Sequence, residues 1–145
     1  MRPHPYLRAY MAGIVVPTMF LLVAFTIYAY FRFLAAPSEL LAPLVNRPFE
    51  RAIVFPLAVV PNLWGAWNML HMALRTRMRI PLALHGALLP ILLVPSGVLL
   101  GRALGVFTIP WPLAVTVMPI GMAVYYLAWK YLVGFLNEEM GIAAE

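Results

Sequence analysis

Apolar residues run along this chain in four long stretches, and short segments rich in proline and arginine separate them. The stretches cover residues 10–34, 52–74, 80–104 and 107–136. Each is longer than the roughly 20 residues that an α-helix needs to cross the hydrocarbon of a bilayer. We therefore predict an all-α fold, a polytopic bundle of four transmembrane helices with short loops, in a single domain over residues 1–145.

The composition supports a membrane protein. Hydrophobic residues make up 64% of the chain and charged residues 10%, with a mean hydropathy of +0.90. A soluble domain is nearer half apolar and a quarter charged, so the lipid bilayer is the solvent that fits this chain. Cysteine is absent, which excludes disulfides, iron–sulfur clusters and thiolate chemistry.

The basic residues predict the orientation of the spans. The net charge of +5 lies mostly in loops and at span ends, so it indicates membrane orientation rather than a nucleic-acid partner. With four spans, the amino-terminal lead, the second turn and the carboxyl end share one side of the membrane. We predict a protein of the cytoplasmic (inner) membrane with both termini cytoplasmic. The basic residues of that side are Arg2, Arg8, Arg75, Arg77, Arg79 and Lys130.

A polar stripe marks the second apolar stretch. Its members, Pro61, Trp64, Asn68, His71 and Arg75, recur every three or four residues and so share one face of a helix. An asparagine or histidine in hydrocarbon needs a partner, so we expect this face to look into the bundle. Two interpretations stay open: hydrogen bonds between helices, or a pathway for a ligand or ion.

Two histidines flank the basic turn. His71 lies four residues before Arg75 and His85 six residues after Arg79, which predicts similar depth in a helical hairpin. Such a pair can bind a metal, share a proton or ligate a haem iron. A haem between them needs the helices held well apart, which a tight hairpin does not favour. The predicted spans hold no carboxylate, so proton-relay and sodium-coupled schemes lack their usual acid.

Glycines and prolines predict packing in the third span. Gly97 and Gly101 form a GxxxG pattern, which lets backbones approach closely, within the bundle or between subunits. We expect residues 95–97, Pro-Ser-Gly, to loosen the middle of this helix. The tail from Asn137 onwards is acidic, and we expect it to be frayed.

The segment between the first two spans carries a family resemblance. Phe49, Glu50 and Arg51 open the second apolar stretch, and this opening in a chain of four spans resembles the MAPEG family of membrane glutathione and eicosanoid enzymes. The resemblance implies a lipid-soluble substrate and a role for Arg51 in binding glutathione. In that family the opening leads into a polar helix, whereas residues 52–56 here are almost wholly apolar.

Three functions follow as hypotheses. The first is a small non-enzymatic membrane protein, either an oligomeric transporter or channel-like protein or an accessory subunit of a membrane complex. Its partners are the lipid bilayer and further copies of itself or another membrane subunit, and it needs no cofactor or metal. The second is a membrane redox protein that binds haem or a metal through His71 and His85. The third is a MAPEG-like enzyme acting on a lipid-soluble substrate.

Overall fold

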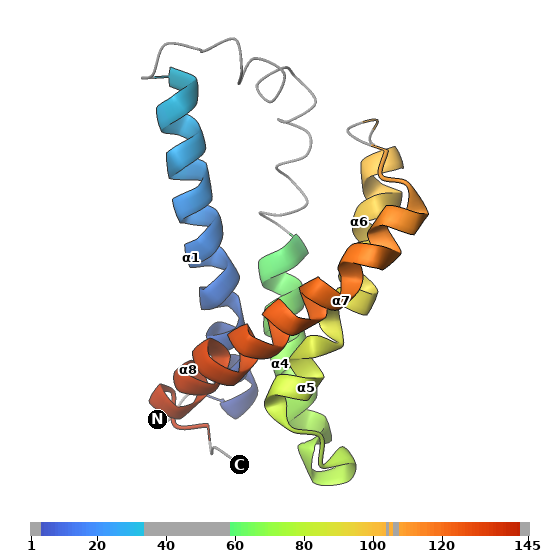
Figure 1. Cartoon of the computed structure of the whole chain (residues 1–145). Coiled ribbons are helices and arrows are strands. Elements are labelled where there is room, and N and C mark those ends of the chain that lie inside the picture. The colour runs from blue at the N-terminus through green and yellow to red at the C-terminus, as the bar shows by residue number, and fades with distance from the viewer. Residues whose placement is uncertain (1–3, 34–58, 104, 106–107, 143–145) are drawn as a thin grey trace.

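The computed structural model describes residues 4–33, 59–103, 105 and 108–142, and these form four helical rods (Figure 1). The all-α prediction is confirmed for this part of the chain. The first loop, with Glu50 and Arg51, and the start of the second predicted span lie outside the described residues. The helices are α1 Pro5–Phe33, α4 Val60–Met78, α5 Leu82–Ala87, α6 Leu89–Ala103, α7 Trp111–Ala128, the π-helix η2 Trp129–Val133 and α8 Gly134–Glu139.

Three of the rods are long and apolar enough to cross a membrane. They are Pro5–Tyr28, Leu82–Ala103 and Trp111–Glu139. Over its described length α4 is not among them, because its inner face carries Asn68 and His71 and its last turn is basic. The prediction of four spans is therefore confirmed in part: four helices form, and three of them have the apolarity of a span.

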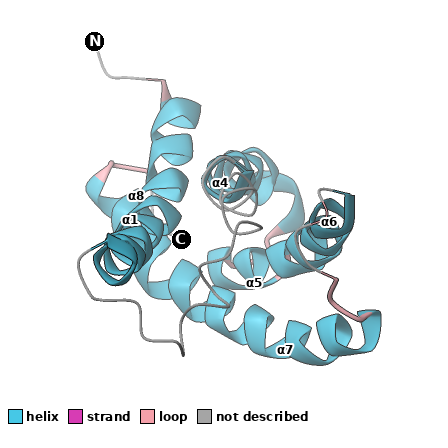
Figure 2. Ribbon diagram, turned by 90° about the horizontal axis from the view of Figure 1, so that it is seen from above, coloured by secondary structure: helices cyan, strands magenta, loops and turns pink. Residues whose placement is uncertain are grey.

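The other three rods surround α4 unevenly. Figure 2 looks along α4, with α1 and α8 on one side of it and α5 and α6 on the other. The rod of α7, η2 and α8 crosses the others obliquely (Figure 1). The start of α1, the end of α8 and the turn between α4 and α5 lie at one end of the molecule. That these regions share one side of a membrane stays a prediction.

Helices α1 and α4 approach each other closely because glycines face each other across the contact. A methyl group at Gly13 would lie 2.6 Å from the carbonyl oxygen of Trp64. A methyl group at Gly65 would lie 2.6 Å from the ring of Tyr10. Small residues at such crossings let helix backbones pack directly in membranes.

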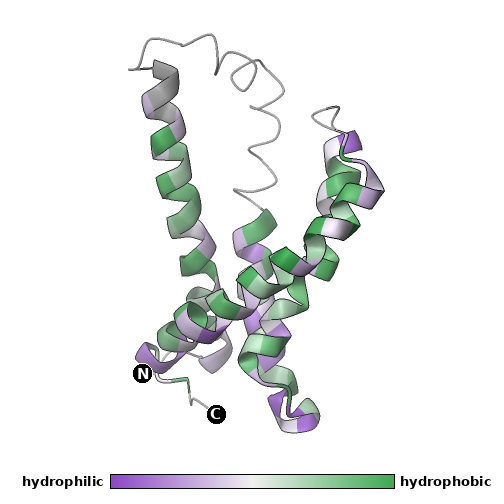
Figure 3. Ribbon diagram, viewed as in Figure 1, coloured by the Kyte–Doolittle hydropathy of each residue, from purple (hydrophilic) through white to green (hydrophobic). Residues whose placement is uncertain are grey.

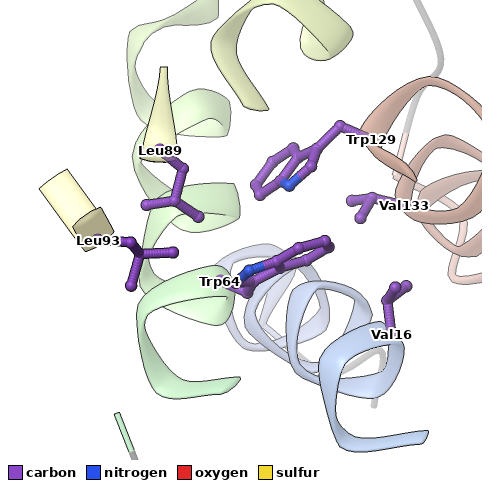
Figure 4. Packing of buried hydrophobic residues seen from close by; sticks show 6 residues of the cluster. All are labelled: Val16, Trp64, Leu89, Leu93, Trp129 and Val133. Atoms are coloured by element: carbon purple, nitrogen blue, oxygen red, sulfur yellow. The ribbon is translucent and has the colours of Figure 1, made fainter. Parts of the chain in front are cut away.

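The hydrophobic core lies where the four rods meet (Figure 4). Two indoles pack against each other at its centre: the ring centroids of Trp64 and Trp129 are 5.6 Å apart, their planes are tilted by 40°, and Trp129 has no exposed surface. Tyr125 lies against the first of these rings at 4.9 Å. The core residues are Val16, Trp64, Leu89, Leu93, Trp129 and Val133.

Proline breaks the third rod at a different place from the one predicted. The break falls at Leu88, between α5 and α6, where Pro90 lacks the N–H that would continue the helix. Helix α6 then runs unbroken through Pro95. Ser96 donates its hydroxyl to the carbonyl of Leu92 at 2.7 Å. Residues 95–97 therefore do not interrupt the helix, and the predicted loosening there stays a prediction.

The tail is also more ordered than the sequence suggested. Helix α8 continues to Glu139, and Ile142 is 7% exposed. Arg8 of α1 donates a hydrogen bond to the carbonyl of Met140, which ties the end of α8 to the start of α1. The predicted fraying is thus wrong as far as Ile142, and residues 143–145 lie outside the described residues.

Replacing Gly86 tests the packing of the core. A methyl group there would lie 2.0 Å from the indole of Trp129, so Gly86→Ala should destabilise the fold by about 1–3 kcal/mol through overpacking. We expect the midpoint of thermal unfolding, followed by circular dichroism in mild detergent, to fall by several degrees.

Gly121→Ala is the matched control. Its added methyl would meet only Pro90, at an ordinary contact distance of 3.9 Å. We expect this variant to unfold at or slightly above the wild-type midpoint, since alanine favours a helix more than glycine does. Equal midpoints for the two variants would contradict the packing described here.

Candidate functional site

The polar stripe of α4 faces the interior, as its spacing predicted. Pro61, Trp64, Asn68 and His71 are buried, and Arg75 at the end of the stripe is half-buried. Asn68 is 1% exposed and His71 7% exposed, although both carry polar groups. The shielding of these groups from lipid is therefore done by the protein itself.

Asn68 joins three helices through its side-chain amide. Its Nδ2 donates to the carbonyl of Ala9 in α1 and to Oδ1 of Asn137 in α8, both at 2.8 Å. Asn137 returns a hydrogen bond from Nδ2 to Oδ1 of Asn68 at 3.3 Å. This pair satisfies both buried amides, which supports the interpretation of the stripe as a link between helices.

The hairpin brings the two histidines together, as predicted. The ring centroids of His71 and His85 are 5.0 Å apart and the rings are tilted by 55°. Trp67 covers His85 from the next turn of α4, with ring centroids 4.9 Å apart. The indole Nε1 of Trp67 donates to the carbonyl of His85 at 2.8 Å, which fixes α5 against α4.

This arrangement does not fit haem ligation between the two histidines, because rings in direct contact leave no space for a porphyrin plane. Among the described residues no group of three histidine, aspartate or glutamate side chains is placed to hold a metal ion. A cavity of about 10 Å³ lies beside the pair, lined in part by Arg75 and Ile80. That is about the size of one water molecule, so the pair is suited to sharing a proton or a water.

A larger polar cavity opens beside Asn68, between α4 and α8. Its volume is about 180 Å³. Two amides and an imidazole line its wall. Two basic side chains and one carboxylate add charge. Of these charged residues, Lys130 and Glu138 lie at exposed positions of the last rod. We call this space the polar cavity. It is lined by Ala9, Asn68, His71, Met72, Arg75, Leu82, Lys130, Gly134, Asn137, Glu138 and Ile142.

Sequence reasoning missed the wall that the last rod contributes. From the sequence, Lys130 is predicted only to help set the membrane orientation, and Asn137 and Glu138 are predicted to lie in a frayed tail. A signal was present, because Val133 and Asn137 follow Trp129 by four and eight residues and therefore share a helical face with it. All three are buried.

The predicted packing glycines lie away from this site. Gly101 is buried within α6, and Gly97 lines a separate apolar cavity between α6 and α7. Close glycine contacts are found at Gly13, Gly65 and Gly86, which lie outside this pattern. Association of subunits through Gly97 and Gly101 stays a prediction.

A double-mutant cycle on Asn68 and Asn137 tests the amide link. Asn68→Leu or Asn137→Leu alone leaves the other buried amide without its partner, so each single change should lower the free energy of unfolding. The free energy of unfolding should fall less in the double variant than the two single losses added together. The difference, which is the coupling energy, should be about 1 kcal/mol. Equilibrium unfolding in mixed micelles measures these free energies.

The control cycle combines Asn62→Leu with Asn137→Leu. Asn62 lies on α4 but accepts its hydrogen bond from Tyr10 on the exposed side, so its effect should add to that of Asn137. Additivity in both cycles would show that the two buried amides are not coupled.

Comparisons with known proteins give no relative from which to argue. The sequence matches no family model, no curated protein and no solved structure. The function of this chain must therefore be argued from its own residues and their geometry.

Proposed function

We propose that this chain is a non-enzymatic integral membrane protein that binds a small anionic solute in the polar cavity. It would act as an oligomeric transporter-like protein or as an accessory subunit of a membrane complex. The observation that carries the proposal is the cavity itself, since charged and amide groups gather in it while three of the four rods are apolar enough to span a membrane. Polar groups held at membrane depth tend to mark the site of function.

The charge of the lining favours an anion. Arg75 and Lys130 contribute two positive charges against the one negative charge of Glu138. A guanidinium presents several donors in a plane that matches carboxylate or phosphate oxygens. The amides of Asn68 and Asn137 add donors and acceptors that can orient a bound group. Neighbouring apolar helices strengthen such contacts, because they lower the local dielectric constant.

The polar groups elsewhere in the described residues support a non-enzymatic role. Glu138 and Glu139 are the carboxylate side chains in that part of the chain, and the whole sequence lacks cysteine. A nucleophilic hydroxyl needs a neighbouring base. Four hydroxyls in the apolar rods instead donate to carbonyls of their own helices; they belong to Thr18, Thr26, Ser96 and Thr116.

The surface of α7 supports an assembly of several subunits. In the rod Trp111–Glu139, which contains α7, only 6% of the most apolar 18-residue stretch is buried in one copy of the chain. Figure 3 shows apolar residues along much of this rod. Lipid can cover such a surface, but a path for a solute needs protein on more than one side. We therefore propose that further copies or a partner membrane subunit complete the structure around the polar cavity.

We also propose that the end carrying both termini and the α4–α5 turn faces the cytoplasm. This end holds Arg8, Arg75, Arg77 and Arg79 in short segments. Basic residues in short loops are retained on the cytoplasmic side during insertion. The polar cavity would then open towards the cytoplasm.

Ligand stabilisation tests the proposed site. We expect inorganic phosphate or acetate, but not choline, to raise the midpoint of thermal unfolding of the detergent-purified protein. A solute present at 100 times its dissociation constant stabilises the folded protein by about 2.7 kcal/mol, which raises the midpoint of unfolding by several degrees. Arg75→Gln and Lys130→Gln should abolish the shift.

Arg77→Gln serves as the control, because Arg77 is an exposed cation of the same helix that does not line the cavity. It should retain the full shift. A shift that survives in Arg75→Gln and Lys130→Gln would contradict the proposed site. A Soret band in the purified protein that disappears in His71→Ala would support the redox alternative instead.

Cysteine labelling tests the orientation, and the chain suits it because it has no cysteine of its own. Thr76→Cys lies in the basic turn, and Thr108→Cys lies in the loop before α7. In intact cells a membrane-impermeant maleimide should label the cysteine at position 108, whereas the one at position 76 should react only after permeabilisation. The reverse pattern would contradict a cytoplasmic location for the basic turn.

A further inference from the structure

A second cavity lies between α6 and α7, away from the polar cavity. Its volume is about 380 Å³, within the range of small-molecule sites. The residues that line it are apolar, and each wall includes a glycine, Gly97 on α6 and Gly121 on α7. We call this space the apolar groove. Leu93, Leu113 and Val117 are among its other lining residues.

The guanidinium of Arg102 and the indole of Trp111 lie at one end of the apolar groove. Arg102 donates from Nη2 to the carbonyl of Ile109 at 3.3 Å, and Ile109 itself lines the groove. The guanidinium carbon of Arg102 lies 5.8 Å from the ring centroid of Trp111. Both side chains are exposed. A guanidinium has five N–H donors, so one hydrogen bond to the backbone leaves others for a ligand.

Arg102 and Trp111 lie at the adjoining ends of two apolar rods, which is where the headgroups of a bilayer would be. Arg102 is the next-to-last residue of the apolar segment Leu82–Ala103, and Trp111 opens the next one. Arginine and tryptophan at the ends of spans lie where phosphates meet hydrocarbon. The apolar groove runs from this headgroup level between α6 and α7. A single molecule could therefore place an anionic head at Arg102 and an apolar chain in the groove.

We propose that the apolar groove binds one membrane phospholipid, with its phosphate at Arg102 and an acyl chain along Gly97 and Gly121. A polar solute does not fit, because the wall offers it no partners. A helix from a second copy fits poorly too, since an α-helix with side chains is about 10 Å across. The proposal is independent of the solute in the polar cavity.

Native mass spectrometry tests this proposal on the full chain in mild detergent, with phosphatidylglycerol as the added lipid. We expect the wild-type chain to retain one phosphatidylglycerol. Val117→Trp would fill the groove from the exposed face of α7 and should lower retention about tenfold. Arg102→Gln should weaken retention to a similar extent, because a charge-assisted hydrogen bond is lost. Added inorganic phosphate should not displace the lipid.

The control is Val124→Trp, the same substitution two turns further along the exposed face of α7 and outside the groove. It should retain lipid like the wild type. Equal retention in Val117→Trp and Val124→Trp would overturn the proposal. Conversion of a dimer to a monomer by Val117→Trp, without a change in bound lipid, would also overturn it and would assign the groove to a second copy. Retention unchanged in Arg102→Gln would overturn the placement of the phosphate.

Discussion

A polar side chain that is buried must find its hydrogen-bond partners inside the protein, and in this chain that constraint falls on α4. The amide of Asn68 meets it by bonding to a backbone carbonyl of α1 and to the amide of Asn137 in α8. These two contacts join the first and last described helices to the second rod. The end of the molecule that holds both termini is therefore organised around one buried amide.

The close approach of the helices makes those hydrogen bonds possible. The carbonyl of Ala9 lies within reach of Asn68 because α1 packs directly on α4 at Gly13 and Gly65. On the other side, Trp129 lies over Gly86 and packs against Trp64, which closes the core beside the amides. The polar cavity is the space left where these tight contacts end and the charged ends of α4 and α8 begin.

The sequence was informative where structure depends on local periodicity. The spacing of Asn68 and His71 indicated an inward face, and the positions of His71 and His85 around one turn indicated their proximity. Both depend on the geometry of a helix or a hairpin alone. The GxxxG pattern of Gly97 and Gly101 indicated close packing at α6, but it did not indicate the tight glycine contacts that join α1 to α4 and α5 to η2.

The features that were missed depend on contacts between segments far apart in the chain. The pairing of Asn137 with Asn68 spans 69 residues, and that of Arg8 with Met140 spans 132. The spacing of Asn137 from Trp129 places both on one helical face, but neither partner, Asn68 or Arg8, can be identified from that spacing. The break at Leu88 lies beside Pro90, which lacks an N–H, and a hydropathy pattern does not encode it.

The central claim is that protein, rather than lipid, covers the polar face of α4. A nitroxide scan of single cysteines over residues 63–74 in bilayers measures it most directly, by the collision rate of each label with oxygen dissolved in the hydrocarbon. The account predicts a helical period in this rate, with minima at Trp64, Asn68 and His71 and maxima at the exposed positions Ala66, Leu70 and Ala73. High oxygen accessibility at Asn68 and His71 would contradict it.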